Sequence, residues 1–340
     1  MGKIVCFGEL MLRLNPAGYL RFEQANAFEA SFGGGEANVA VSLAHFGMDA
    51  SFVSKFPAHS IGDMGIRALR AEDVSTKDIV RGGERMGIYY LEKGASQRAS
   101  KVIYDRKYSS ISMAERADFD WNAILDGADW FHFTGITPAL SDTVAEITLD
   151  ALKVCKEKGI KVSCDLNFRK KLWSSEKAGK VMGELCQYVD ICIANEEDAE
   201  KVFGIKPDHN DAEGGKLNRE GYIDVAKKLS DRFGFEKVAI TLRESISAND
   251  NNWAAMLYAD GEAYFSKKYA VHIVDRVGGG DSFGAGLIYG LMNGFDCQKT
   301  IEFAVAASCL KHSIETDFNY VSVDEVTTLM KGDGSGRVQR

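Results

Sequence analysis

The sequence predicts an α/β protein whose central sheet is mainly parallel, flanked by helices and accompanied by a small separate β-sheet. From residue 128 onward, short apolar runs alternate with amphipathic stretches, which is the pattern of repeated strand–helix–strand units. Residues 10–32 and 86–108 show a partial two-residue alternation instead, which favours exposed strands. Hydrophobic residues make up 45% of the 340 residues and charged residues 26%, so the chain can bury a large core.

The large α/β part is expected to start with a buried strand that ends before Gly8-Glu9, and Gly33-Gly34-Gly35 then opens a helix. Parallel strands joined through helices require right-handed crossovers. Strands are expected at 4–7, 51–56, 129–134, 160–165, 189–194 and 236–242, with two more strand-like segments in 253–271, and helices at 36–46, 62–73, 142–158, 175–187, 196–204, 219–233, 282–293 and 297–312.

The small sheet is expected to form a flap over the large domain. Residues 10–32 are rich in aromatic side chains, and residues 86–108 form a hairpin that turns at Gly94–Gln97. The aromatic strands would leave exposed edges, so pairing between subunits through this lid is expected. The predicted division is therefore a large domain of residues 1–9, 33–85 and 109–330, a lid of residues 10–32 and 86–108, and a flexible tail of residues 331–340.

Charge and cysteine usage exclude several classes of protein. The net charge is −8 and no basic block occurs, which argues against nucleic-acid binding. No stretch approaches the roughly 18 consecutive apolar residues of a membrane span, and the N-terminus becomes polar too early for a signal peptide. The seven cysteines are scattered without a C-x-x-C pair, which indicates free thiols in a reducing compartment. The protein is expected to be cytoplasmic.

The run from Asp275 to Asp281 (DRVGGGD) carries the strongest chemical signal. Three glycines, Gly278, Gly279 and Gly280, let a backbone approach a ligand without side-chain clash. A helix follows, so the glycine amides point out of a helix N-terminus and attract phosphate. Asp281 could then accept a proton from a hydroxyl nucleophile. The alternative is that Asp281 only caps the helix.

This run resembles the C-terminal signature of the ribokinase-like (PfkB-type) carbohydrate kinases. Three other segments support the resemblance in the same order as in that family: Gly33 to Ala40 (GGGEANVA), Asp165 to Arg169 (DLNFR) and Asn195 to Asp198 (NEED). The four segments together cover essentially the whole chain and are specific, although each alone is weak. The chain departs from the family pattern at Gly279, Arg276 and Asp198, where Ala, Thr and Glu are usual.

The resemblance implies a ribokinase-like fold, with Asp281 as catalytic base and the amides of Gly278, Gly279 and Gly280 around the transferred phosphate. Within the family the chain is most similar to 2-keto-3-deoxygluconate kinases. This similarity implies a sugar-acid site formed by Gly34, Gly35, Asn38, Tyr89, Tyr104, Arg106, Asn167, Arg169 and Asp281. A substrate carboxylate favours a guanidinium, which binds it in a two-pronged way.

Alternatives remain open at several of these positions. Arg106 could be a surface charge of the flap, and Arg169 could contact the transferred phosphate instead of the sugar. Tyr89 and Tyr104 could be a packed cross-strand pair.

The resemblance also implies ATP and Mg²⁺ as cofactors. The nucleotide site would comprise Asn195, Thr241, Arg243, Gly278, Gly280, Ser308, His312 and Asn319. The family often has Gly near Arg243, so the contact of Arg243 with ATP is open. Glu197 and Asp198 would hold magnesium, which takes carboxylates, water and nucleotide phosphates. Asp275 would belong to a site for a monovalent cation such as K⁺.

The predicted reaction is ATP-dependent phosphorylation of 2-keto-3-deoxygluconate at its 6-hydroxyl, giving 2-keto-3-deoxy-6-phosphogluconate. A fructokinase or another sugar kinase of the same family is the nearest alternative. A dinucleotide-dependent oxidoreductase is disfavoured, because no G-x-G-x-x-G follows the first strand. A sugar-binding protein that has lost catalysis is disfavoured by the intact glycine turn and Asp281. The predicted partners are a sugar acid, ATP and a second copy of the chain.

Overall fold

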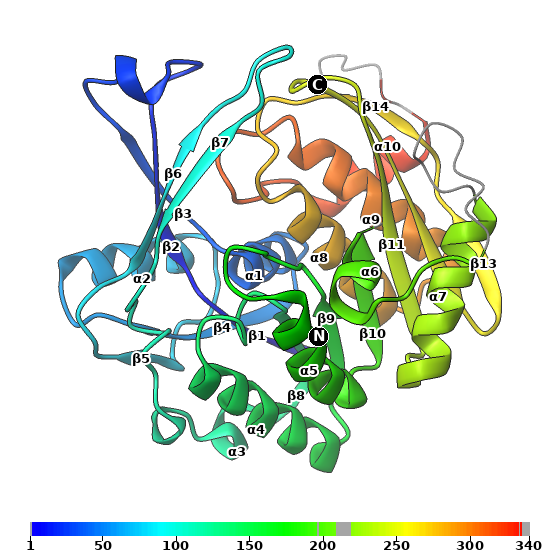
Figure 1. Cartoon of the computed structure of the whole chain (residues 1–340), viewed down its shortest axis with the longest axis horizontal. Helices are drawn as coiled ribbons and strands as arrows, with labels where there is room; N and C mark the ends of the chain where they lie inside the picture. Colours follow the sequence, from blue (N-terminus) through cyan, green and yellow to red (C-terminus); the bar gives the residue numbers. More distant parts are fainter. Residues whose placement is uncertain (1, 196, 209–218, 333, 335–340) are drawn as a thin grey trace.

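The computed structural model describes residues 2–195, 197–208, 219–332 and 334, and within them a large sheet forms the centre of the molecule (Figure 1). Its strands lie in the order β13-β12-β11-β10-β9-β8-β1-β4-β5, with β14 also pairing with β12. The strands are β1 (Lys3–Phe7), β4 (Asp49–Phe56), β5 (Ile79–Arg81), β8 (Ala128–Thr134), β9 (Lys161–Asp165), β10 (Ile191–Asn195), β11 (Lys237–Ser245), β12 (Asp250–Ala259), β13 (Glu262–Phe265) and β14 (Tyr269–His272).

The pairs from β5 across to β11 are all parallel, and the pairs beyond β11 are antiparallel. Strands β1, β8 and β10 are buried along nearly their whole length, as expected of parallel strands with helices on both faces. The predicted fold class, a mainly parallel α/β sheet with a separate small sheet, is confirmed.

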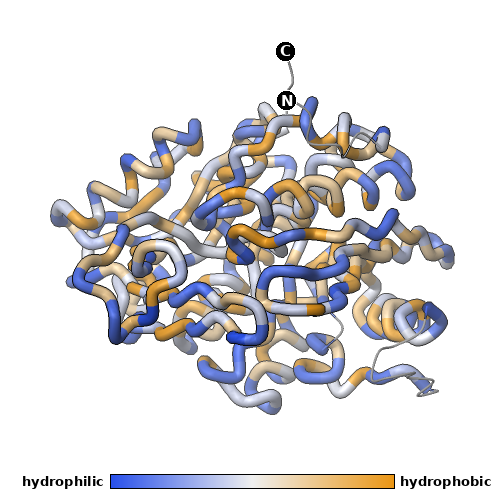
Figure 2. The backbone as a smooth tube through the Cα atoms, turned by 90° about the horizontal axis from the view of Figure 1, so that it is seen from above, coloured by the Kyte–Doolittle hydropathy of each residue, from blue (hydrophilic) through white to orange (hydrophobic). Residues whose placement is uncertain are grey.

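Helices cover both faces of this sheet, and the sheet separates the interior into two hydrophobic clusters. Along most helices hydrophobic and hydrophilic stretches alternate, because each helix buries one side (Figure 2). One cluster contains residues of α1 (Gly35–His45), α2 (Ser60–Ala71), α8 (Gly279–Met292), α9 (Cys297–Lys311) and α10 (Val323–Met330). The other contains residues of α3 (Trp121–Ile124), α4 (Asp142–Lys158), α5 (Ser175–Leu185), α6 (Asp198–Phe203) and α7 (Arg219–Phe233).

Three details differ from the sequence-based expectation. The segment 253–271 holds three strands, β12 to β14, because β12 is long enough to pair with both later strands. Helices α3 and α10 were not expected; α10 begins at a capping box formed by Ser322 and Glu325, a pattern visible in the sequence. Helix α8 begins at Gly279, so Asp281 lies inside its first turn instead of before it.

The small sheet has the order β3-β2-β6-β7 and stands beside the carboxyl ends of the parallel strands (Figure 1). It consists of β2 (Met11–Asn15), β3 (Glu29–Gly33), β6 (Gly87–Glu92) and β7 (Lys101–Asp105), with a short 3₁₀ turn at Phe22–Gln24. The β6–β7 hairpin closes with Ala95 opposite Arg98. Its first strand, β2, continues almost directly from β1, so the flap shares its base with the large sheet.

In open α/β sheets, ligands bind beyond the carboxyl ends of the strands. The segments predicted to carry chemistry end there: Asp165 closes β9 and Asn195 closes β10. No helix in the described part of the chain is both long and apolar enough to cross a membrane. Most of the tail predicted at 331–340 lies outside the described residues.

Candidate active site

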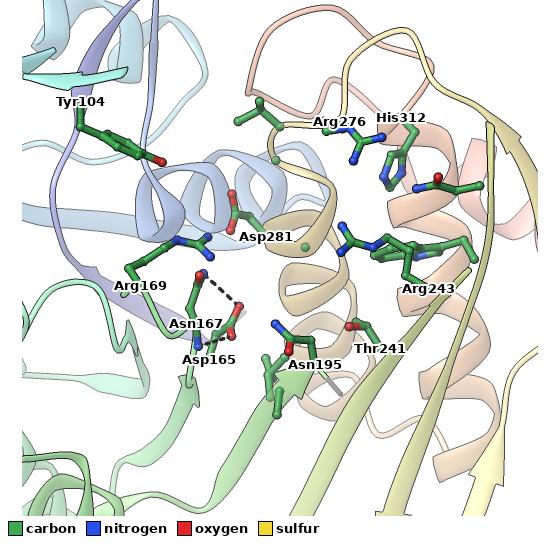
Figure 3. A pocket seen from close by; sticks show the side chains of 17 residues that line it. Tyr104, Asp165, Asn167, Arg169, Asn195, Thr241, Arg243, Arg276, Asp281 and His312 are labelled. Atoms are coloured by element: carbon green, nitrogen blue, oxygen red, sulfur yellow. Dashed lines mark hydrogen bonds between the residues drawn. The ribbon is translucent and has the colours of Figure 1, made fainter. Parts of the chain in front are cut away.

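Two adjoining cavities lie between the large sheet and the small one. The larger, of about 370 Å³, extends over the ends of β9, β10 and β11, and the smaller, of about 110 Å³, lies beneath the flap. Asp281 belongs to the walls of both cavities, and Figure 3 shows its carboxylate facing into the larger one. The other shared wall residues are Tyr104, Asn167, Arg169 and Val277.

Asp281 is not a helix cap. Gly278 takes the cap position of α8 in the left-handed conformation, with φ of +83°. The Asp281 carboxylate instead accepts a hydrogen bond of 2.7 Å from Nδ2 of Asn38 on α1. Gly35, also on α1, leaves room beside this carboxylate, since a Cβ there would lie 3.7 Å from Oδ1. The glycines that open α1 and the glycines that open α8 therefore converge on one carboxylate.

Burial raises the pKa of Asp281 to about 6, while the hydrogen bond from Asn38 and the charges of Arg169 and Lys311 partly oppose this rise. A general base works best when its pKa lies near the operating pH. Asp281 therefore has the electrostatic setting of a general base that is ionised at neutral pH and protonated in mild acid.

The pH dependence of activity should report this carboxyl group. Because only ionised Asp281 can accept a proton, kcat/KM should fall about tenfold per pH unit below about pH 6. Asn38→Ala removes a donor that favours the ionised form, so the acidic limb should move to higher pH. Ser42→Ala on the same helix serves as the control and should leave the limb in place. An acidic limb near pH 4, or one that Asn38→Ala does not move, would contradict this assignment.

The three glycines of the turn have different surroundings. Gly278 and Gly280 line the larger cavity. Gly279 is buried behind them, where its carbonyl accepts a 2.6 Å hydrogen bond from the Ser308 hydroxyl and a Cβ would lie 2.5 Å from the His312 ring. Ser308 was predicted to contact the nucleotide, and this prediction is corrected: its hydroxyl supports the turn from behind.

The smaller cavity gathers all nine of the predicted sugar-site residues. Its wall includes Gly34, Gly35, Asn38, Tyr89, Tyr104, Arg106, Asn167, Arg169 and Asp281. Gly34 is required where it stands, since a Cβ would lie 2.0 Å from the carbonyl oxygen of Glu9. Tyr89 donates its hydroxyl proton to the Asp317 carboxylate and also packs on Tyr104, with ring centroids 6.2 Å apart.

Arg106 is not a surface charge of the flap, since it is 8% exposed. Its Nε donates to Glu9 at 2.8 Å, and a second nitrogen of the guanidinium contacts the same carboxylate. Ser109 also donates to Glu9, at 2.5 Å. Glu9 was not predicted as a site residue; it lies just after β1, where the flap begins. The charge of Arg106 is thus balanced before any substrate enters.

The larger cavity gathers polar side chains from several strand ends (Figure 3). Asn195, Thr241, Arg243 and His312 of the predicted nucleotide site belong to its wall. The sequence-based reasoning did not assign Arg276 to it. Burial, together with the nearby charge of Arg243, lowers the pKa of Arg276. Two guanidinium groups that repel one another at a cavity wall form a natural anion site.

Two residues of this cavity wall carry unsatisfied polar groups. Within the described residues, Oδ1 of Asn251 and Nε1 of Trp253 are buried without a hydrogen-bond partner. Unpaired buried polar atoms are costly in free energy, and both of these belong to residues of the cavity wall. Beside them, burial lowers the pKa of His312 to about 4, so its imidazole is neutral.

Three other predicted ligand contacts lie outside both cavity walls; the nucleotide contact of Asn319 is corrected, and the magnesium roles of Glu197 and Asp198 stay predictions. Asn319 is fully buried and donates to the Ser282 hydroxyl at 2.8 Å, which ties the C-terminal segment to α8. Glu197 is exposed at the start of α6. Asp198 is buried, and its carboxylate accepts the backbone amides of Phe168 and Asn195, both at 3.1 Å. That carboxylate holds the loops after β9 and β10 together.

Asp165 was not among the residues predicted to hold magnesium. It lines the larger cavity at the end of β9 and accepts the backbone amide of Asn167 at 3.1 Å. Burial, with the like charges of Asp198 and Asp281, raises the pKa of Asp165 well above its usual value. A cation at this wall would relieve that repulsion, so the residues present fit a magnesium ion near Asp165. The segment from Asp165 to Arg169 was singled out in the sequence, so Asp165 could have been considered there as a metal ligand.

Glu36 is a buried carboxylate beneath the smaller cavity that sequence reasoning also left out. It accepts hydrogen bonds from the hydroxyls of Thr134 and Thr137, at 2.8 and 2.6 Å, and from the Thr134 amide. Burial raises the pKa of Glu36 to about 7. These contacts fix the start of α1 to the end of β8 and so hold Gly34 and Gly35 in place.

Asp275 does not offer a cation site. Its Oδ2 is bound by a guanidinium nitrogen of Arg13 at 2.5 Å, and its Oδ1 accepts the Val277 amide at 3.1 Å. The predicted monovalent-cation role of Asp275 therefore does not fit these residues, because a buried arginine already neutralises the carboxylate.

Comparison with known proteins decides the family. The sequence profile of the pfkB family carbohydrate kinases matches residues 1–314. The chain belongs to the pfkB family of carbohydrate kinases. An oxidoreductase is thereby excluded.

Alignments with relatives of this kinase cover nearly all of its chain. A 2-dehydro-3-deoxygluconokinase structure from Thermotoga maritima is 53% identical, with a TM-score of 0.94, and the match covers 97% of this chain and 98% of that one. A pfkB family carbohydrate kinase structure from Listeria grayi is 35% identical with a TM-score of 0.90, over 97% and 99% of the chains. The 2-dehydro-3-deoxygalactonokinase of Haloferax volcanii is 30% identical over 98% of both chains.

A more distant structure, from Escherichia coli, was solved in complex with ATP and Mg²⁺. It is 19% identical, with a TM-score of 0.81, over 97% of this chain and 99% of that one. At this identity the match supports the common fold alone.

Proposed function

We propose that this kinase transfers the γ-phosphate of ATP to the 6-hydroxyl of 2-keto-3-deoxygluconate, giving 2-keto-3-deoxy-6-phosphogluconate and ADP. The observation that carries the proposal is that Asp281 belongs to the walls of two adjoining cavities. The larger cavity, with Arg243 and Arg276, suits a polyphosphate, and the smaller one suits a sugar acid. The 53% identity to a 2-dehydro-3-deoxygluconokinase supports the choice of sugar.

In the proposed step the 6-hydroxyl oxygen attacks the γ-phosphorus while Asp281 takes the hydroxyl proton. The new oxygen–phosphorus bond forms as the bond between the γ-phosphorus and the bridging oxygen of ADP breaks, and ADP leaves with that electron pair. The amides of Gly278 and Gly280 lie in the cavity wall at the N-terminus of α8, where they stabilise negative charge on the transferred group, whereas the amide of Gly279, also predicted to act there, donates to the carbonyl of Arg276 at 3.4 Å. Asn38 orients the Asp281 carboxylate toward the sugar site.

Recognition of the sugar acid is divided between two arginines. Glu9 already balances Arg106, so Arg106 chiefly offers directed hydrogen bonds. Arg169 is exposed at the junction of the two cavities and supplies the positive charge. A guanidinium at this junction suits the carboxylate of the sugar acid and the transferred phosphate alike.

Magnesium, when bound with ATP, supplies charge neutralisation for the nucleotide phosphates. Asp165, with Asn195 beside it in the wall, would hold the ion. Magnesium characteristically takes one or two carboxylates and completes its shell with water and phosphate. The absence of a three-residue metal cluster among the described residues agrees with that habit.

We further propose that the small sheet, residues 10–32 and 86–108, acts as a lid over the smaller cavity and excludes water during transfer. The lid exposes Tyr19, Phe28 and Ile103, so we propose a homo-oligomer that pairs through the lid, which sedimentation velocity would test. All seven cysteines are free thiols, which supports a cytoplasmic location; fractionation of the producing cells would test it.

The substrate is tested by ADP release across a panel of sugars and sugar acids. We expect 2-keto-3-deoxygluconate to exceed fructose by roughly 10–100-fold in kcat/KM, because a charged hydrogen bond contributes about 1.5–3 kcal/mol. The C4 epimer, 2-keto-3-deoxygalactonate, belongs in the panel, since a relative carries that name. Efficient phosphorylation of fructose without preference for keto-deoxy sugar acids would favour a fructokinase. No ADP release with any sugar, from folded protein, would favour a binding protein that has lost catalysis.

Arg169→Ala sharpens the same test. It should lower kcat/KM for the sugar acid roughly 10–100-fold and leave poor neutral substrates much less affected. If neutral and acidic substrates lose activity equally, Arg169 serves the transferred phosphate instead of the carboxylate. Lys170→Ala, at the neighbouring exposed position, is the matched control.

A further inference from the structure

The last residue of α9, Lys311, is fully buried directly behind the catalytic turn. Its ammonium donates to two backbone carbonyls, those of Thr316 at 2.8 Å and Ile314 at 3.2 Å. Thr316 adopts a left-handed backbone conformation, with φ of +65°, which is unfavourable for a β-branched residue. Residues 314–316, which follow α9, thus fold around the ammonium group of Lys311.

Two buried carboxylates and a second buried cation complete the surroundings of Lys311. Arg13 donates to Asp275 at 2.5 Å and to Asp317 at 2.8 Å. Burial lowers the pKa of Lys311, and the negative charges of Asp275 and Asp317 oppose that shift. Lys93 also lies 3.8 Å from Asp275 but is itself paired with Glu315, so Arg13 and Lys311 are the two cations that balance Asp275 and Asp317.

This cluster is in contact with the glycine turn. A Cβ on Gly278 would lie 3.2 Å from Cε of Lys311 and 2.2 Å from the carbonyl oxygen of Asp317. The backbone that Lys311 holds through Thr316 is therefore the surface on which Gly278 rests. Loss of the ammonium would release this backbone and, with it, the amides that face the larger cavity.

Carbonyl oxygens grouped around a positive charge are also the way proteins bind potassium. We propose that Lys311 is a built-in substitute for a monovalent cation, which holds residues 314–317 beneath the Gly278 turn and makes phosphoryl transfer independent of K⁺ and Na⁺. The proposal rests on the kinase function argued above. Lys311 acts as a positioning residue, since it lines neither cavity wall.

The unmodified enzyme gives the first test. ADP release is measured with the sugar acid and MgATP in K⁺, Na⁺, NH₄⁺ or choline chloride at constant ionic strength. We expect rates within about twofold of one another. A larger stimulation by K⁺ over choline would overturn the proposal, whatever the variants do.

Two substitutions separate the charge from the space it fills. Lys311→Met keeps the aliphatic volume without the ammonium, and Lys311→Ala also opens room for an ion. Both should lower kcat at least tenfold in choline. Lys311→Ala should recover in K⁺ or NH₄⁺ while Lys311→Met should not, a difference that a merely structural role of the lysine would not produce. Lys299→Met, which removes an exposed lysine from the same helix, is the control.

Thermal unfolding supplies a readout that does not need turnover. K⁺ should raise the Tm of Lys311→Ala relative to choline and leave the wild type and Lys311→Met unchanged. Wild-type kcat in Lys311→Met, or a folded Lys311→Ala that no cation restores or stabilises, would overturn the proposal. If the wild type releases no ADP with any sugar, the proposed function fails, and the Tm comparison still decides the role of Lys311.

Discussion

Asp281→Asn is expected to lower kcat by about 10²–10⁴-fold, the range attributed to a positioned general base. The amide is nearly the same size as the carboxylate, and its oxygen can still accept the hydrogen bond from Asn38, so the site keeps its shape. What is lost is the capacity to take the proton of the sugar hydroxyl. Steady-state ADP release and single-turnover kinetics would measure the loss.

Binding must be measured beside turnover for this variant. Calorimetry should give dissociation constants for the sugar acid and for ATP within a few-fold of the wild type. Asp231→Asn, an exposed carboxylate on α7, controls for the change in net charge. Near-normal turnover of Asp281→Asn with intact sugar binding would show that another group is the base.

Gly278→Ala is expected to damage both folding and catalysis. Gly278 has a φ of +83°, where an alanine is strained, and its Cβ would lie 2.2 Å from the carbonyl oxygen of Asp317. The contact is with backbone, so relief requires movement of the chain itself. We expect the free energy of unfolding to fall by about 3 kcal/mol or more, and kcat to fall at least about 100-fold as the turn amides move.

Gly280→Ala provides the matched comparison within the same turn. A Cβ at Gly280 would meet no atom within 4 Å, and the residue lies in the first turn of α8. The substitution should therefore leave the denaturation midpoint unchanged or raise stability by about 0.5–1 kcal/mol. If Gly278→Ala were as stable as Gly280→Ala, the close packing of the turn on Asp317 would be refuted.

Local patterns in the sequence were sufficient for most of the fold. Parallel strands such as β8 and β10 are continuous apolar runs, and helices such as α4 carry a serine cap and a terminal glycine. The signal was weaker for β14, a four-residue strand whose existence depends on pairing with the long β12. A strand stabilised mainly by its partner leaves little trace in its own residues.

The sequence indicated the site most clearly where a reactive side chain and the glycines that shape the backbone lie in the same short segment. Asp281, Gly278 and Gly34 all lie in glycine-rich segments at helix starts, and the structure brings them together. Ser308 and Asn319 were misassigned because nearness in sequence to a predicted pocket does not give the direction of a side chain. The partners of Glu9 and Arg13 were unpredictable for a similar reason, since each ion pair joins residues far apart in the chain.

Arg13 has a mechanical consequence for the flap. It lies in the middle of β2, yet its side chain is buried between Asp275 and Asp317 of the large domain, and Tyr89 of β6 reaches the same Asp317. These contacts fix the root of the small sheet to the large domain, so the proposed lid motion would take place beyond them. Asp275, which anchors the flap through Arg13, begins the run that ends in Asp281. The anchor of the flap and the glycine turn therefore belong to one continuous stretch of chain. Motion of the proposed lid over the sugar site and the position of the glycine turn are therefore mechanically coupled.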